Sequence, residues 1–202
     1  KISMANEAEK TLHEMQQVLT IDANGVYETE EDKAELLWHE LQNAYRSKRI
    51  LSGVLSGVEE TSSGSIAVVY YKGQRMIIPV SEMELNLSEQ NGYGEMKGRQ
   101  VRILNNMVGC EIDFILIALD DTARSVVASR RLAMLAKRRK FYFPNENGNA
   151  QITEGRVVQA RVIAVAEKVV RLEVFGAECA VPARDIAWEW VGDAREKYHV
   201  AD

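Results

Sequence analysis

The chain has 202 residues, of which 46% are hydrophobic and 27% are charged, so it can bury the core of one or two domains of about 100 residues each. No run of about 18 apolar residues could span a membrane, and the N-terminus lacks the pattern of a secretion signal, so we expect a cytoplasmic protein. Cys110 and Cys179 lie far apart, without a His or Cys at ligand spacing. This excludes a disulfide framework and a metal site, and predicts two buried thiols.

The net charge of -5 is unevenly distributed. Residues 1–48 hold ten Asp and Glu against five Lys and Arg, whereas residues 49–202 balance at twenty of each. The balanced part contains a basic strip without any intervening carboxylate, which consists of Arg124, Arg130, Arg131, Lys137, Arg138, Arg139 and Lys140. Such a strip is usually a solvated face, but it can also meet phosphates.

Two amphipathic helices are predicted in the acidic part. Residues 6–19 carry apolar residues at helical spacing behind Asn6, a helix cap. Thr29 with Asp32 forms a weakened capping box for the second helix. Its apolar stripe is Leu37, Leu41, Ala44 and Tyr45, widened by Leu36 and Trp38. The pair is either a packing arm or a docking arm for a protein partner.

Two stretches that lie 103 positions apart share one β pattern. Residues 67–72 and 170–175 alternate apolar and outward side chains, as half-buried strands do. A turn follows at Gly73 and at Gly176, then a second short strand that ends at Pro79 and at Pro182. The equal spacing predicts two copies of one small β unit.

The other strands of the first copy flank this hairpin. Residues 51–58 place small residues between apolar ones, as in a bent strand at a barrel corner, and residues 61–64 form a hairpin loop. We expect a long irregular crossing over residues 84–98, then strands over 109–119 and 125–129. Five strands with a long connection after the third predict a Greek-key barrel.

The second copy follows a basic connector. Residues 130–143 are expected to form a helix that stops before Pro144, and residues 145–149 to form a linker. The second barrel is predicted to start at Gly155, where Val158, Ala160 and Val162 repeat Leu51, Gly53 and Leu55 at an offset of 107. Because Asp202 falls where a fourth strand would begin, we expect this copy to have its first three strands only, with sheet edges covered by other residues.

Two segments resemble one family, the RNA-binding domain named after bacterial ribosomal protein S-one, an OB-fold barrel. Residues 119–131, Leu-Asp-Asp-Thr-Ala-Arg-Ser-Val-Val-Ala-Ser-Arg-Arg, resemble its last hairpin. Residues 182–188, Pro-Ala-Arg-Asp-Ile-Ala-Trp, followed by residues 198–202, resemble the stretch after its third strand. The resemblance covers residues 49–202 and is similar in order to the second and third repeats of that ribosomal protein.

The resemblance implies an RNA surface on one face of each barrel. The hairpin Asp and Arg of the family are present as Asp120 and Arg124. The family's two strand aromatics correspond to Val68 and Ser65 in the first copy and to Arg171 and Lys168 in the second, and its His corresponds to Pro79 and Pro182. Lost rings weaken base stacking, so charge is the expected source of affinity.

Outward aromatic and basic residues are expected to compensate. Tyr70 and Lys72 should share a strand face with Val68, and Phe175 one with Arg171, although cross-strand packing is an alternative reading. At least one of Trp188 and Trp190 should be buried. The predicted RNA-binding residues are Tyr70, Lys72, Asp120, Arg124, Lys168, Arg171 and Phe175.

The sequence therefore predicts a mainly β protein with a helical N-terminal arm and tandem five-stranded OB-fold Greek-key barrels, the second incomplete. The domains would be an acidic arm (1–48), a first RNA-binding barrel (49–130), a basic connector and linker (131–150) and a second barrel (151–202). Scattered His residues and the lack of a nucleophile or phosphate-loop motif predict no enzyme activity, cofactor or metal. We expect binding of single-stranded RNA with low sequence selectivity and a role in translation. The alternative is a module that docks on the ribosome or another protein, with degenerate RNA faces.

Overall fold

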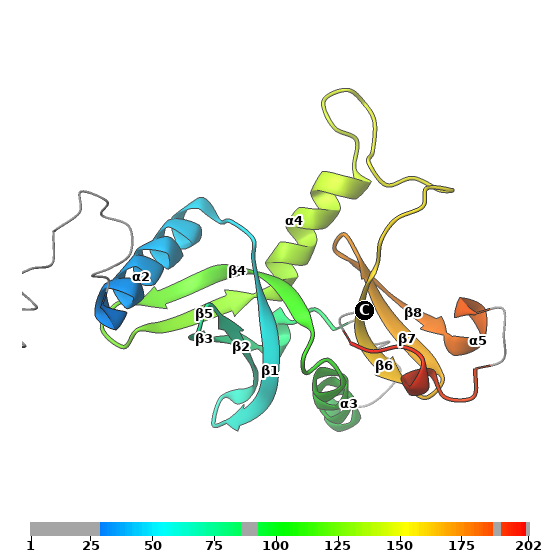
Figure 1. The fold of residues 1–202 in the computed structure, drawn as a ribbon, viewed down its shortest axis with the longest axis horizontal. Coiled ribbons are helices and arrows are strands. Elements are labelled where there is room, and N and C mark those ends of the chain that lie inside the picture. Colours follow the sequence, from blue (N-terminus) through cyan, green and yellow to red (C-terminus); the bar gives the residue numbers. More distant parts are fainter. Residues whose placement is uncertain (1–28, 86–92, 188–190, 201–202) are drawn as a thin grey trace, which may run out of the picture. The chain divides into compact units, whose positions relative to one another are not determined.

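The computed structural model describes residues 29–85, 93–187 and 191–200, without the side chains of residues 93–95 (Figure 1). The chain divides into two compact units, residues 1–37 and 38–202. The predicted helix over residues 6–19 and the two tryptophans at 188 and 190 lie outside the described residues. No helix in the described ranges is long and apolar enough to cross a membrane.

Helix α2 spans Glu30–Ser47 and begins at the predicted capping box. The Thr29 backbone N–H donates to Asp32 Oδ2 at 3.0 Å, and the Asp32 N–H donates to Thr29 Oγ1 at 3.1 Å. These reciprocal bonds satisfy donors that the first helical turn would leave open. Trp38, Leu41 and Ala44 are buried, which confirms the predicted apolar stripe in the later part of the helix, whereas Leu36 is 58% exposed and does not widen it.

Five strands close into a barrel in the order β1-β2-β3-β5-β4. They are β1 Leu51–Thr61, β2 Gly64–Tyr71, β3 Gln74–Pro79, β4 Glu111–Asp120 and β5 Ser125–Ser129. The β3–β5 pair is parallel and the others are antiparallel. All five expected strands are present, and their order is consistent with an OB-fold.

The small residues of β1 allow its tight curvature. A Cβ atom at Gly53 would lie 2.6 Å from the carbonyl oxygen of Tyr70 on the neighbouring strand. The β1–β2 register shifts between Leu55 and Gly57, so an extra residue bends β1 there. A side chain at position 53 would therefore obstruct closure of the barrel.

The crossing after β3 is more regular than predicted. The 3-10 turn η1 spans Val80–Glu82, and helix α3 spans Tyr93–Asn106, so the expected irregular crossing over residues 84–98 is wrong in its last part. The glycines of α3 disfavour a helix locally. Leu104 and Met107 are fully buried, and this packing outweighs the weak local propensity.

Helix α4 spans Arg130–Tyr142 and connects the barrel to the second copy. Ser129 Oγ accepts the Leu132 N–H at 3.1 Å and caps its first turn. In the turn that follows, Asn145 Oδ1 accepts the N–H groups of Asn147 and Asn149. The predicted helical connector and linker are thus observed.

The second copy forms a three-stranded sheet in the order β6-β7-β8. Its elements are β6 Arg161–Ala166, β7 Val169–Val174, β8 Ala177–Pro182, helix α5 Ala183–Ile186 and the 3-10 turn η2 Ala194–Glu196. Val162, Val170, Ala183 and Ala194 form its small core. The barrel covers the start of this sheet, where the Cys110 thiol donates to the Val162 carbonyl oxygen at 3.8 Å.

Strand β6 begins at Arg161, later than the predicted start near Gly155. In the barrel, Leu51 to Val54 pair with β4. The equivalent residues 158–161 have no such partner strand within the described ranges, because the three-stranded sheet contains no counterpart of β4. Strand structure therefore starts only where β7 provides hydrogen bonds.

Both copies share a bulge and a turn at equivalent positions. The β6–β7 register shifts between Val162 and Ala164, as β1–β2 does between Leu55 and Gly57. Each β hairpin turns through two residues of positive φ, Lys72-Gly73 in the barrel and Phe175-Gly176 in the sheet. The predicted repeat is therefore matched in local geometry.

The two thiols differ in exposure. Cys110 is buried, and this burial raises its pKa to about 11. Cys179 is exposed, so the expectation of two buried thiols is wrong for this residue. It lies on β8, an edge strand of the small sheet, where one face has little to pack against.

Candidate nucleic-acid interface

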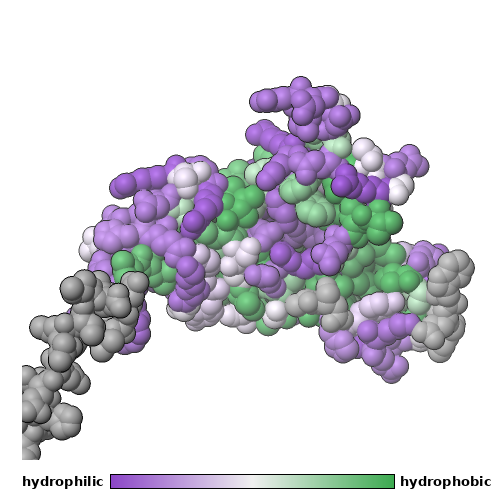
Figure 2. Space-filling view, turned by 45° about the horizontal axis from the view of Figure 1, so that its top comes forward, coloured by the Kyte–Doolittle hydropathy of each residue, from purple (hydrophilic) through white to green (hydrophobic). Residues whose placement is uncertain are grey.

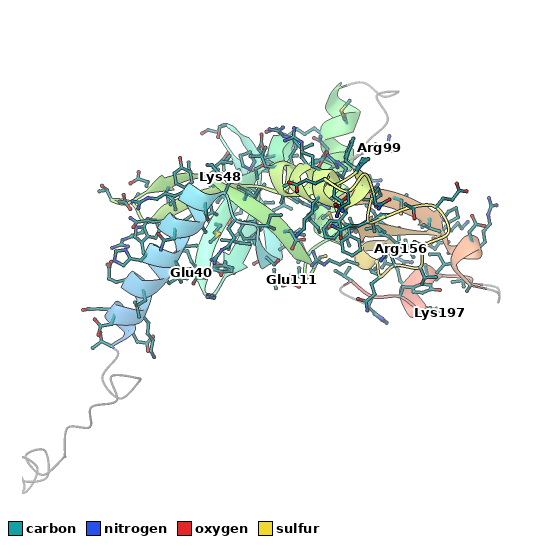
Figure 3. All side chains as sticks on the ribbon, turned by 90° about the horizontal axis from the view of Figure 1, so that it is seen from above. Glu40, Lys48, Arg99, Glu111, Arg156 and Lys197 are labelled. Atoms are coloured by element: carbon teal, nitrogen blue, oxygen red, sulfur yellow. The ribbon has the colours of Figure 1, made fainter. Side chains whose placement is uncertain are left out.

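Four predicted residues lie at the end of the barrel that α2 covers. Tyr70 is 45% exposed, but Lys72 Nζ donates to Glu40 Oε2 of α2 at 2.7 Å. Glu40 also accepts the Tyr71 hydroxyl at 2.8 Å and a bond from Arg49 at 3.1 Å. Hydrogen bonds from Lys72 and Tyr71 hold the pKa of Glu40 below its usual range. Helix α2 thus supplies a carboxylate where an RNA phosphate was predicted (Figure 3).

The β4–β5 turn is held by the same helix. Asp120 Oδ1 accepts the N–H groups of Thr122 and Ala123 at 2.9 Å each, which is the role of Asp in a turn. The Arg124 guanidinium lies 4.8 Å from the centre of the Trp38 ring, and Trp38 Nε1 donates to Asp121 Oδ1 at 2.7 Å. Asp120 and Arg124 thus flank one turn, in which Asp120 bonds to backbone groups of the turn and Arg124 contacts Trp38 of α2.

Two other positions of the barrel to which the resemblance assigns RNA contacts lie at the end of the β2–β3 hairpin that is away from its turn. Ser65 and Pro79 line a cleft of about 430 Å³ with Lys97 and Gln100 of α3. Val68 is only 5% exposed, so the outward strand face predicted to run through it is not open there. The family's RNA-face positions are therefore split between two ends of the first barrel.

The three predicted residues of the second copy have different surroundings. The Lys168 side chain is 82% exposed in the β6–β7 turn. The Arg171 side chain is 18% exposed and pairs with Glu178 of β8. Phe175 lies in the β7–β8 turn, and its ring centre is 4.4 Å from that of Phe141 in α4. Lys72 and Phe175 were predicted on strand faces and instead occupy turns, with φ of 48° and 47°.

The basic strip clamps the two copies together. Arg130 is fully buried, donates to Glu178 Oε2 at 3.2 Å and lies 3.7 Å from Glu173 Oε2. Lys137 Nζ pairs with Glu173 and, at 2.6 Å, with Asp113 Oδ2. The carboxylates come from β4, β7 and β8, so α4 is bonded to both sheets, between which it lies in Figure 1.

Burial makes this ion cluster sensitive to the loss of any member. Burial alone would raise the pKa of Asp113, but hydrogen bonds from Lys137 and Ser52 and the nearby charge of Arg161 lower it overall. Removing one partner of a buried pair leaves an uncompensated charge. The cluster therefore fixes how the small sheet sits on the barrel.

The outer members of the strip are also paired. Arg131 bonds to Glu82 at 2.9 Å, and Arg138 bonds to Glu84 at 2.6 Å and to the Gly176 carbonyl at 2.8 Å. The expected solvated basic face is therefore present at Arg131, whose side chain is 47% exposed, but not at Arg138, which is half-buried between partners distant in sequence. Asp113, inside an apolar strand, was a signal for the clamp that sequence reasoning missed.

The sequence analysis did not select Phe141 either, because this residue follows the basic strip and belongs to no amphipathic pattern.

Among the described residues, no group of three or more His, Cys, Asp and Glu side chains could hold a metal ion.

Comparison with known proteins shows two similarities, one to a domain family and one to a ribosomal protein. Residues 151–202 match the S1 RNA binding domain. The chain is also 24% identical over 189 residues to the small ribosomal subunit protein bS1 of Coxiella burnetii (strain RSA 493 / Nine Mile phase I). This match covers 92% of the chain and 31% of that protein, so the chain spans about a third of its relative.

The S1 RNA binding domain match covers the residues that form β6, β7 and β8. The first similarity is to an RNA-binding domain and the second is to a ribosomal protein, and neither is to an enzyme.

Proposed function

We propose that this protein binds single-stranded RNA with low sequence selectivity and acts in translation in the cytoplasm. The S1 RNA binding domain match over residues 151–202 carries this proposal. The similarity to bS1 supports the role in translation. Binding would rest on backbone charge and partial stacking, as in other proteins that hold single strands.

The shared bulge and turn support a tandem repeat of Greek-key OB units, similar to the second and third repeats of the ribosomal relative. The proposed organisation is the acidic arm (1–48), a first barrel (49–130), the connector (131–150) and a second unit (151–202). The connector contributes the clamp that joins the units.

We place the main RNA contacts on the second unit. Lys168 is exposed and its ion-pair partner, Glu167, lies 4.0 Å away, so its ammonium group can reach a phosphate. Lys72 and Arg124 of the first barrel are engaged by α2, so they and their neighbours Tyr70 and Asp120 are proposed as secondary contacts. Arg171 would contact RNA only by sharing its guanidinium between Glu178 and the RNA.

Fluorescence anisotropy with a labelled single-stranded RNA over a salt series tests the proposal. We expect binding at low salt that weakens as salt rises, because phosphate contacts release counterions. Lys168→Glu should weaken binding, while Lys33→Glu, an equal charge change on α2, should not. No binding at low salt, or binding that ignores salt, would refute the RNA function.

A second candidate is docking on the ribosome or on another protein of translation. The engagement of Lys72 and Arg124 by α2 favours it, because the first barrel then offers fewer free groups to RNA. Cosedimentation with small ribosomal subunits distinguishes the two functions. Docking predicts that Lys168→Glu still cosediments, whereas an RNA contact through the second unit predicts that it does not.

A further inference from the structure

A cleft lies where the end of α4 meets the second unit. It has a volume of about 520 Å³ and is lined by Lys137, Phe141, Gln159, Ala160, Arg161, Glu173 and Phe175. A second hollow of about 260 Å³ shares Phe141, Gln159 and Phe175 with it, so the two are adjacent. The larger volume is within the range of small-ligand sites, roughly 300–1,000 Å³. Figure 2 shows apolar surface beside hydrophilic residues on the side that carries α4 and the small sheet.

The two phenylalanines supply an aromatic wall. Their ring centres are 4.4 Å apart with an angle of 40° between the rings, and both side chains are only partly buried. Phe175 has a φ of 47°, a left-handed conformation that is costly for an aromatic residue. Lys72 occupies the same turn position in the first barrel, so the ring at this position is particular to the second unit.

Cationic groups surround the rings. Lys137, Arg161 and Arg156 line the two hollows together with one carboxylate, Glu173. Lys137 pairs with that carboxylate, and Arg161 Nη1 lies 3.9 Å from it, so Glu173 is neutralised. Arg161 Nη1 also lies 3.4 Å from Asp113 Oδ2, and within the described part of the chain this buried nitrogen forms ion pairs without a hydrogen bond.

The outer cations lie close to the wall. Lys140 Nζ is 5.5 Å from the centre of the Phe141 ring. Arg156 lies in the segment between α4 and β6 and is exposed (Figure 3). Its Nη1 donates to the Gln151 carbonyl at 2.6 Å, which holds the side chain at the rim and leaves other donors of the guanidinium for a ligand.

We propose that this cleft is a nucleotide subsite that stacks one base of a single-stranded RNA on Phe141 and Phe175 and holds the adjoining phosphate with Arg156 and Arg161. The inference rests on the proposed RNA function and names where on the chain it occurs. Flat rings beside cations fit the base and phosphate of a single strand, and stacking tolerates any base. The Gln159 amide can donate to or accept from a base edge without demanding one sequence.

The proposed subsite consists of residues from the connector and from the second unit, so it differs from an RNA-binding face formed by one barrel alone. Gly176 follows Phe175, and a Cβ there would collide with the α4 backbone. The Arg138 guanidinium also bonds to the Gly176 carbonyl at 2.8 Å. These contacts and the buried ion cluster hold the two rings together before RNA arrives, which lowers the entropic cost of binding.

Affinity for a labelled oligouridine, measured by anisotropy on the full chain, tests the subsite. Phe175→Leu and Phe141→Leu keep apolar bulk but remove the ring, and each should weaken binding about five-fold or more. Phe143→Leu is the matched control, since Phe143 is 61% exposed and does not line the cleft. It should bind as the wild type does. Arg156→Gln should lower the slope of log affinity against log salt by about 0.7, one single-strand phosphate contact.

The outcomes separate the two proposals. A wild-type chain that does not bind RNA overturns the RNA function itself. Wild-type binding with unchanged affinity in Phe175→Leu and Phe141→Leu overturns the subsite and leaves the function standing. An equal loss in Phe143→Leu also overturns it, because any exposed ring would then serve. Thermal unfolding of each variant must match the wild type, and cross-linking of 5-iodouridine RNA to Phe141 or Phe175 provides a readout in the unaltered chain.

Discussion

The two β units share a local pattern and differ in what surrounds it. The first is a closed five-stranded barrel in which the candidate RNA residues Lys72 and Arg124 contact α2. The second has three strands and carries an aromatic cleft beside α4. At the equivalent turn, Lys72 bonds to a carboxylate of α2, whereas Phe175 packs on Phe141. The same β hairpin therefore anchors α2 in one copy and packs on α4 in the other.

The connector makes the second unit dependent on the first. Its buried cations bond to carboxylates of both sheets, so the connector holds the small sheet on the barrel. Predictions about stability therefore separate residues that face this junction from equivalent residues that do not.

The largest effect is expected from Arg130→Met. Glu173 and Glu178 would remain buried without this cation, and breaking a buried pair costs about 3–5 kcal/mol of unfolding free energy. Arg131→Met removes a neighbouring cation that is 47% exposed and should cost no more than about 1 kcal/mol. Urea denaturation measures both. Equal losses in the two variants would contradict a buried clamp.

Gly176→Ala should destabilise more than Gly73→Ala. Both glycines have positive φ, so each substitution costs about 1–2 kcal/mol of backbone strain. A Cβ at position 176 also meets the α4 backbone, which adds about 1–3 kcal/mol, whereas nothing lies within 4 Å at position 73. Thermal or urea unfolding gives the difference. If the two variants are equally stable, the second hairpin does not rest on α4.

Acid should weaken the junction through Asp113. Its pKa is lower in the folded protein than in the unfolded chain, so its stabilising contribution is present above the ordinary carboxyl pKa of about 4 and is lost as pH falls through the lowered folded pKa. Asp113→Asn should therefore lose less unfolding free energy between about pH 5 and pH 3 than the wild type does. Identical profiles of unfolding free energy against pH in the two proteins would show that Asp113 does not stabilise the ion cluster.

The smallest effect is expected from Trp38→Phe at the first barrel. The variant loses the bond from Trp38 Nε1 to Asp121, worth about 0.5–1.5 kcal/mol of unfolding free energy, while Gln42 still donates to that carboxylate. RNA affinity should stay the same, because the main contacts are on the second unit. Tighter RNA binding would show that α2 masks a binding face of the first barrel.

The sequence predicted the strands because alternation, turn glycines and Pro79 and Pro182 are local signals. It did not predict α3, whose helical structure depends on burial of Leu104 and Met107. It also misread the basic strip, since the strip's partners are brought close only by folding. Phe175 was selected for RNA binding from the sequence, but its neighbour Phe141 became visible only in the folded chain.

Mapping of photo-cross-links from a 5-iodouridine RNA onto the full chain tests the difference between the two units most directly. Mass spectrometry should locate the cross-links at Phe141 and Phe175, beside α4 and the β7–β8 turn. Cross-links concentrated at Tyr70 and around the α2 end of the first barrel, with none at the aromatic cleft, would contradict this assignment of the RNA site.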